Sequence, residues 1–104
     1  MEKTNFKLSR PIKAHGEEVT ELSIRRPTTQ EARAIKQLPY TLGETGHPVA
    51  DLEVAAKYLA VCAAIPAGSV NELDLFDLNT LVWMVIGFFL SPATKAPDSE
   101  APST

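Results

Sequence analysis

Residues 6–24 read FKLSRPIKAHGEEVTELSI, and they indicate how the chain begins to fold. Apolar residues recur at alternate positions in both halves of this stretch: Phe6, Leu8, Ile12, Leu22 and Ile24. Such alternation is typical of strands with one buried face. His15-Gly16 lies between the halves and suits a tight turn, because glycine adopts a positive φ without strain. The sequence therefore predicts a β-hairpin over residues 5–26.

The length of the turn determines which residues of the hairpin face each other. A two-residue turn pairs residues whose numbers sum to 31, which sets Leu8 against Ser23 and puts the apolar rows on opposite faces. A three-residue loop or a bulge shifts the sum to 32, so that Leu8 faces Ile24. We expect the second register because both rows then share one face. Pro11 has no N–H to donate, so we also expect the first strand to lie at an edge or to break there.

Helix caps divide the next part of the chain. The sequence TTQE at residues 28–31 fits a capping box, and Pro39 follows it, which predicts a helix over about residues 28–38. Two glycines and two prolines make residues 39–48 a predicted loop. Asp51 then caps a second helix over about residues 51–65.

The last part of the chain contains a further helix and a polar tail. The sequence SVNE at residues 69–72 fits a second capping box that opens one turn at most, and Asp74 caps a final helix over about residues 74–90. Residues 91–104 lack large apolar side chains, so we expect a disordered tail. The predicted fold class is α+β: an N-terminal β-hairpin followed by a small bundle of three to four helices, in a single domain over residues 1–90.

Composition and charge exclude several classes of function. The formal net charge is -3, whereas nucleic-acid binding calls for a basic excess. The most apolar run, residues 81–90, is about half as long as a membrane span. The first five residues lead into no apolar run, so we expect no secretory signal. The single cysteine, Cys62, reads as a small core residue in a reducing compartment. We therefore expect neither a nucleic-acid nor a membrane partner.

Residue types that carry out chemistry are sparse. His15 and His47 each lie beside a turn signal, and with Cys62 they do not supply a set of metal ligands. No glycine-rich loop is followed by Lys-Ser or Lys-Thr, as a phosphate loop requires. We interpret Asp74 and Asp77 as a cap and as an acidic side chain that complements the helix dipole. The sequence thus predicts no catalytic residue, no cofactor, no metal and no enzymatic activity.

The most basic spot in the chain is the pair Arg25 and Arg26. One interpretation is a solvated or salt-bridged surface, with Glu21 or Glu31 as the acidic partner. The other is a docking site for acidic groups on another protein. The sequence leaves both interpretations open.

The last two helices carry more apolar surface than a few short elements can cover. Leu81, Met84 and Phe88 fall on one face of the final helix. They either pack in the core or form an exposed patch for self-association or for a hydrophobic client. The candidate partner-binding residues are therefore Arg25, Arg26, Leu81, Met84 and Phe88.

Several segments, in a fixed order along the chain, suggest a family. They are LSRPI at residues 8–12, HG at 15–16, VTELSIRRPT at 19–28, an alanine-rich helix at 55–64 and NELDLFDL at 71–78. With these segments the chain resembles the small tail assembly chaperones of tailed bacteriophages, of the Mu-like kind found with contractile tails. The resemblance covers roughly residues 6–90. Its most specific piece is residues 19–28, while the later half is similar in composition.

The resemblance implies a role in building the phage tail. Such a protein binds the long, helix-rich tape measure protein, keeps it soluble and presents it to tail tube subunits. It works in the host cytoplasm and is absent from the mature virion. In many such systems a ribosomal frameshift also yields a C-terminally extended form. The alternatives are a structural tail component retained in the virion and a small nucleic-acid-binding regulator.

Overall fold

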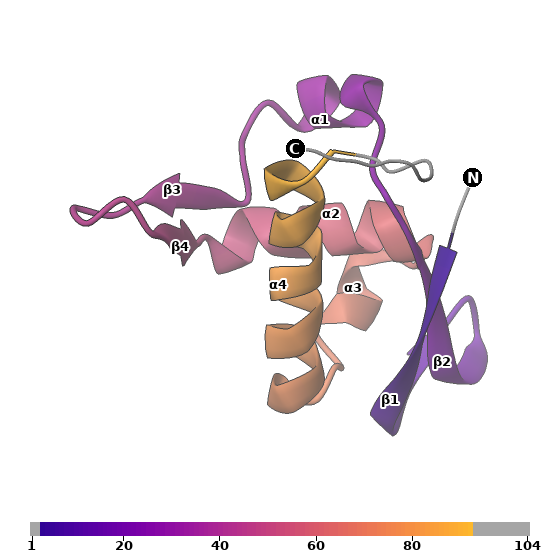
Figure 1. The fold of residues 1–104 in the computed structure, drawn as a ribbon. Helices are drawn as coiled ribbons and strands as arrows, with labels where there is room; N and C mark the ends of the chain where they lie inside the picture. Colours follow the sequence, from indigo (N-terminus) through magenta and orange to yellow (C-terminus); the bar gives the residue numbers. More distant parts are fainter. Residues whose placement is uncertain (1–2, 93–104) are drawn as a thin grey trace, which may run out of the picture.

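The computed structural model of the chain describes residues 3–92 and contains two β-hairpins and four helices. The elements are β1 (Lys3–Ala14), β2 (Glu17–Arg25), α1 (Thr29–Ile35), β3 (Tyr40–Leu42), β4 (Pro48–Ala50), α2 (Leu52–Ala63), α3 (Ala67–Val70) and α4 (Leu75–Leu90). In Figure 1, α4 runs across α2, and the long β1–β2 hairpin stands beside α3. The predicted α+β fold with an N-terminal hairpin is confirmed. The predicted disordered tail lies outside the described residues, apart from its first two positions.

The register of the β1–β2 hairpin differs from the prediction. His15 and Gly16 have φ angles of 56° and 78°, so the turn has two residues, and Ile12 pairs with Val19, a sum of 31. Farther from the turn, Phe6 pairs with Leu22, a sum of 28. The predicted sum of 32 was therefore wrong. The register shifts in the stretch that contains Pro11, which lacks an N–H, and a shift of an odd number of residues brings both apolar rows to the buried face.

Helix α1 begins with the predicted capping box and ends earlier than predicted. The Glu31 N–H donates to Thr28 Oγ1 at 3.1 Å, and the Thr28 N–H donates to Glu31 Oε1 at 2.9 Å. The last helical residue is Ile35, because Lys36 adopts a left-handed conformation with φ 69° and its N–H closes on the Ala32 carbonyl.

Residues 39–48 were predicted to be a loop, and this prediction was wrong. Tyr40 pairs with Ala50 and Leu42 with Pro48, so that β3 and β4 form a second hairpin. The loop between them is closed by the Gly43 N–H, which donates to the His47 carbonyl at 2.8 Å. The glycines therefore mark a turn between two strands. This hairpin projects from the body of the molecule (Figure 1).

The hydrophobic core lies where the β1–β2 hairpin, α2 and α4 meet. Helix α2 begins at its predicted cap, with the Val54 N–H donating to Asp51 Oδ1 at 3.2 Å. Its Tyr58 and Leu59 side chains are enclosed, and Cys62 is a buried core residue as predicted. The Tyr58 hydroxyl donates to the Gln37 carbonyl at 2.7 Å, which satisfies the polar end of this ring. The other buried apolar residues are Leu8, Ile12, Ala14, Leu22, Ile24, Val54, Ala55, Ile65, Val70, Leu73, Leu81, Val82, Val85 and Ile86.

Two polar residues around α3 join this helix to β1. Residues 69–72 were predicted to form a capping box, but Ser69 lies inside α3, and α3 has no side-chain cap. The Ser69 hydroxyl donates instead to the Lys13 carbonyl at 2.5 Å, and Glu72 Oε1 accepts from the Lys13 N–H at 2.9 Å. The predicted cap was wrong because both polar side chains bind a strand that is distant in the sequence.

Helix α4 is fixed to the hairpin near its N-terminus. Asp74 caps it as predicted, accepting from the Phe76 N–H at 3.1 Å. Asp77, interpreted above as a dipole-complementing residue, is 1% exposed. Its carboxylate accepts from the Ser9 N–H and from the Ser9 hydroxyl, each at 2.7 Å. Asp77 therefore links α4 to β1, which is a tertiary role that the helix-dipole interpretation missed.

Candidate binding surface

The predicted apolar face of α4 is largely turned toward the protein interior. Leu81 is 0% exposed and belongs to the core. A surface role therefore does not fit Leu81. Met84 and Phe88 are partly buried and pack against the core. Their contact with a partner stays a prediction.

A different side of α4 faces solvent along the whole helix. This side, which we call the α4 stripe, consists of Phe76, Asn79, Thr80, Trp83, Gly87 and Leu90. The spacing of three and four residues places these positions above one another on one face. Phe76 is 68% exposed, Trp83 43% and Leu90 52%. The α4 stripe is thus an exposed apolar surface on a helix whose opposite face is core.

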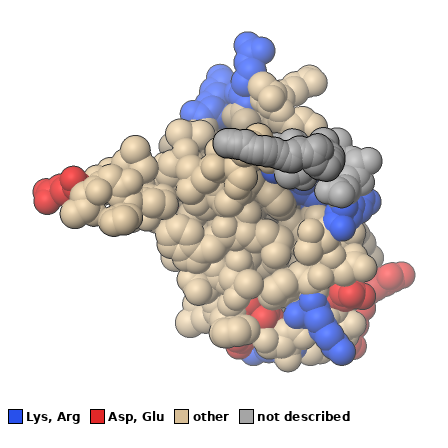
Figure 2. All heavy atoms as spheres, in the orientation of Figure 1, with Lys and Arg blue, Asp and Glu red and all other residues tan. Residues whose placement is uncertain are grey.

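The α4 stripe carries no charged side chain. Figure 2 shows the face of the molecule that bears α4, and its central part is free of blue and red atoms, with the charges at the margins. At Gly87 an added Cβ would meet no atom within 4 Å, so a partner can approach the backbone there. The sequence signal for this face was the pair of small polar residues, Asn79 and Thr80, which marks the solvent side of an otherwise apolar helix.

Arg25 is engaged in a salt bridge within the protein. Its guanidinium donates to both carboxylate oxygens of Glu31, at 2.8 and 2.6 Å. Of the two interpretations of this basic spot, the salt bridge with Glu31 is the one observed for Arg25. The hydrogen bonds from Arg25 and from the Thr28 backbone lower the pKa of Glu31 from 4.5 to about 2. The hydrogen bond with Glu31 raises the pKa of Arg25.

The lowered pKa of Glu31 predicts a pH-dependent contribution to stability. Because the folded-state pKa lies below the unfolded one, the ionised carboxylate stabilises the fold above about pH 4.5, and this contribution is lost as the pH falls toward 2. We expect Glu31→Gln to lower the free energy of unfolding at pH 7 by about 0.5–1 kcal/mol, since the pair is partly exposed. Urea unfolding of both proteins across this pH range measures the effect.

The matched control for that measurement is Glu21→Gln, because Glu21 is an exposed acid that faces Lys7 across the hairpin. We expect its unfolding curve to keep the pH dependence of the wild-type protein. Equal pH dependence in Glu31→Gln and in the wild-type protein would contradict the role of the Arg25 bridge.

Arg26 is tied to the C-terminal end of α4. Its guanidinium donates to the Phe88 carbonyl at 2.6 Å and to the Ser91 carbonyl, and its central carbon lies 5.7 Å from the centre of the Phe88 ring. Helix α4 has no basic residue in its own last turn, so Arg26 supplies the cation that the helix dipole favours there. Within this structure Arg26 therefore acts as a clamp on α4.

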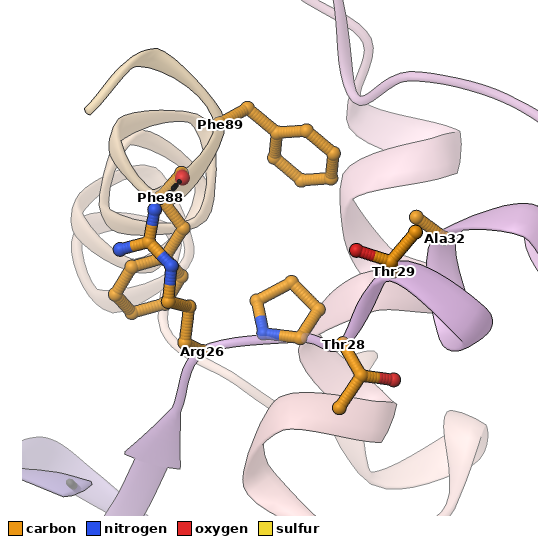
Figure 3. Close-up of a pocket in the computed structure, with 7 residues that line it drawn as sticks. Arg26, Thr28, Thr29, Ala32, Phe88 and Phe89 are labelled. Atoms are coloured by element: carbon orange, nitrogen blue, oxygen red, sulfur yellow. Dashed lines mark hydrogen bonds between the residues drawn. The ribbon is translucent and has the colours of Figure 1, made fainter. Parts of the chain in front are cut away.

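Among the described residues, a hollow lies beside α4 near each of its ends. The first has a volume of about 280 Å³ and is lined by Arg26, Pro27, Thr28, Thr29, Ala32, Phe88 and Phe89. In Figure 3 the Arg26 guanidinium lies beside the Phe88 ring, and the Phe89 ring reaches from α4 toward α1. The second, which we call the α2–α4 groove, has a volume of about 290 Å³ and is lined by Leu52, Glu53, Ala56, Val70, Asn71, Leu73, Leu75 and Leu78.

The histidine and cysteine side chains of the described residues lie in different parts of the fold. Over residues 3–92, no three His, Cys, Asp or Glu side chains lie close enough together to hold a metal ion. Burial raises the pKa of Cys62 to about 11, which keeps this thiol protonated at neutral pH. His15 lies at the exposed hairpin turn, with its Nε2 3.0 Å from the Ala64 carbonyl oxygen. Within the same part of the chain, no helix has the length and apolar character to cross a membrane.

Comparison with known proteins identifies the family. Residues 5–90 match the family described as phage tail assembly chaperone proteins, E, or 41 or 14. No curated protein and no solved structure matches the chain. The match covers all four described helices, the second hairpin and all but the first two residues of the first hairpin. It agrees with the resemblance carried by the VTELSIRRPT segment at residues 19–28. The chain belongs to the family of phage tail assembly chaperones.

Proposed function

We propose that this chaperone binds the tape measure protein of its phage, keeps it soluble in the host cytoplasm and presents it to the tail tube subunits. In this proposal the chaperone leaves before the particle is complete and is absent from the mature virion. The observation that carries the proposal is the α4 stripe, an exposed and uncharged surface with Phe76, Trp83 and Leu90 along it. Such a surface suits a client that is helical and apolar on one side.

The length and composition of the α4 stripe support a helical client. Phe76 and Leu90 are 14 positions apart, so the stripe is about 21 Å long, which is about four turns of a facing helix. Trp83 lies in the middle of it, and large aromatic residues near the centre of an interface contribute most to affinity. The absence of charge favours apolar contact over electrostatic steering.

The stripe is also held in place before any client arrives. Asp77 fastens the first part of α4 to Ser9, and Arg26 fastens the last turn through the Phe88 carbonyl. A surface that is already ordered loses less conformational entropy on binding. Helix α4 is therefore suited to present an ordered binding surface along which a long client lies.

Co-expression tests this proposal. The tape measure protein of the phage is expressed alone and together with the affinity-tagged chaperone, and its soluble fraction and its recovery with the tag are measured. We expect it to be insoluble alone, soluble in the presence of the chaperone, and recovered with it. A tape measure protein that stays insoluble in both cases, or that is soluble but not recovered with the tag, would overturn the proposal.

Mass spectrometry of purified virions distinguishes the chaperone from a structural tail component. We expect tail tube peptides and tape measure peptides in the particle and none from this chain. A stoichiometric amount of this chain in mature particles would favour the structural alternative.

A further inference from the structure

The α2–α4 groove is an apolar hollow that the core does not fill. Its floor contains the buried residues Val70 and Leu73, and its rim carries Leu52 and Leu75, which are 56% and 80% exposed. Leu75 and Leu52 begin their helices directly after the caps Asp74 and Asp51, where polar residues would serve the helix equally well. Apolar side chains at these two positions are therefore not explained by folding.

The groove is separate from the α4 stripe. Leu78 precedes Trp83 by five positions, which places it about 140° around the helix from Trp83 at 3.6 residues per turn. Leu75 contributes to the groove, while its neighbour Phe76 belongs to the stripe. Substitutions at the two surfaces can therefore be made and measured independently.

The surroundings of the groove favour a basic partner. Glu53 is the one charged residue that lines it, and Asp51, Glu72 and Asp74 each adjoin a lining residue. Asp51 and Asp74 each accept a backbone N–H at the start of a helix.

Three cations lie close to these acids. Lys57 follows Glu53 by one helical turn, the Arg10 guanidinium donates to the Glu72 carbonyl at 3.3 Å, and the backbone N–H of Lys13 donates to Glu72 Oε1. Four carboxylates against three cations leave the region net acidic by one charge, which attracts Lys and Arg on a partner.

We propose that the α2–α4 groove is a second client contact, which takes one large apolar side chain of an amphipathic helix flanked by Lys or Arg. This inference rests on the proposed function, since the client is the same tape measure protein. The apolar side chain enters between Leu52 and Leu75, and the basic residues lie over Glu53 and its acidic neighbours. The groove thus selects which helical segment of the client binds beside the stripe.

The test uses a synthetic helical peptide of Leu and Lys, and a matched peptide with Glu in place of Lys. Fluorescence anisotropy of the labelled peptides gives their affinities for the full chain. We expect the Leu–Lys peptide to bind more tightly. Leu52→Ser with Leu75→Ser weakens it at least about tenfold through lost apolar burial, and Glu53→Lys weakens it about threefold through one lost ion pair.

Three controls make the test specific. Glu44→Lys makes the same change in charge at the tip of the β3–β4 hairpin, and it should leave the affinity within about twofold. Leu42→Ser with Val49→Ser should do the same, because it removes two exposed apolar side chains of the β3–β4 hairpin that do not line the groove. Circular dichroism of each variant checks that it is folded, which is expected because all the substituted side chains are exposed.

Three results would overturn the groove proposal and leave the proposed function standing. The first is equal affinity for the two peptides, and the second is unchanged affinity in the groove variants. A dimer in sedimentation that becomes a monomer in Leu52→Ser with Leu75→Ser would assign the groove to self-association and overturn it as well. Failure of the proposed function has a different readout, namely no recovery of the tape measure protein with the wild-type chaperone.

Discussion

Replacement of Asp77 by Ala is expected to lower the free energy of unfolding by about 2–3 kcal/mol. The carboxylate is 1% exposed and accepts two hydrogen bonds from Ser9, each at 2.7 Å. A hydrogen bond to a charged group contributes about 1.5–3 kcal/mol, and the exposed position of Ser9 reduces the loss because water can replace part of it. A domain of this size has a total stability of about 5–15 kcal/mol, so the change is a large fraction of the whole.

Urea unfolding followed by circular dichroism measures this change, and two variants serve as controls. Asp77→Asn keeps an acceptor oxygen and the side-chain volume, so it should lose less than Asp77→Ala. Asp74→Ala removes only the partly exposed cap, at a cost of about 1 kcal/mol. Equal stability of Asp77→Ala and Asp74→Ala would contradict the tertiary role of Asp77, because Asp77 would then contribute no more than a helix cap does.

The parts of the fold that were predictable from sequence are those specified by neighbouring residues. Thr28, Asp51 and Asp74 each cap a helix through an N–H two or three positions ahead, so the signal and the contact lie in the same short segment. The β1–β2 hairpin is likewise predicted by the alternation of apolar residues and by the His15-Gly16 turn. Contacts of this kind involve no distant partner, so a short stretch of sequence is enough to predict them.

The parts that sequence reasoning missed depend on distant partners. Asp77 and Ser9 are 68 positions apart, and Ser69 bonds a carbonyl 56 positions away. Ser69 was interpreted as a cap and Asp77 as a residue that complements the helix dipole, although each makes a tertiary hydrogen bond. The pairing of β1 with β2 also depends on the register shift in the stretch that contains Pro11. The alternation of apolar residues alone does not specify where that shift occurs.

The position of the exposed surface on α4 was not predictable from the sequence. The excess of apolar residues left both core packing and an exposed patch open, and the structure has one side of the helix in the core and another side exposed. The most apolar face, however, is the one that a core takes first, and Leu81 is accordingly enclosed. The exposed side is the one that mixes Phe76 and Trp83 with small polar residues, because that face can meet water before a partner covers it.

Placing serine at both aromatic positions of the α4 stripe is expected to abolish recovery of the tape measure protein. Phe76→Ser with Trp83→Ser removes the two largest exposed side chains of the stripe, and aromatic residues that dominate an interface contribute about 2 kcal/mol or more each. The affinity should therefore fall by about 100-fold or more. The free energy of unfolding should change by less than about 1 kcal/mol, because both side chains already face water.

The matched control is Leu42→Ser with Val49→Ser on the β3–β4 hairpin, where the two side chains are 65% and 53% exposed. This variant loses a similar amount of exposed apolar surface away from α4, and it should recover the tape measure protein as the wild type does. Met84→Ser with Phe88→Ser gives a useful contrast. Both residues pack against the core and Phe88 lies under Arg26, so we expect this variant to lose stability by about 1–3 kcal/mol. Equal loss of client in the stripe and hairpin variants would mean that general hydrophobicity holds the client, whereas loss in the stripe variant alone places the contact on α4.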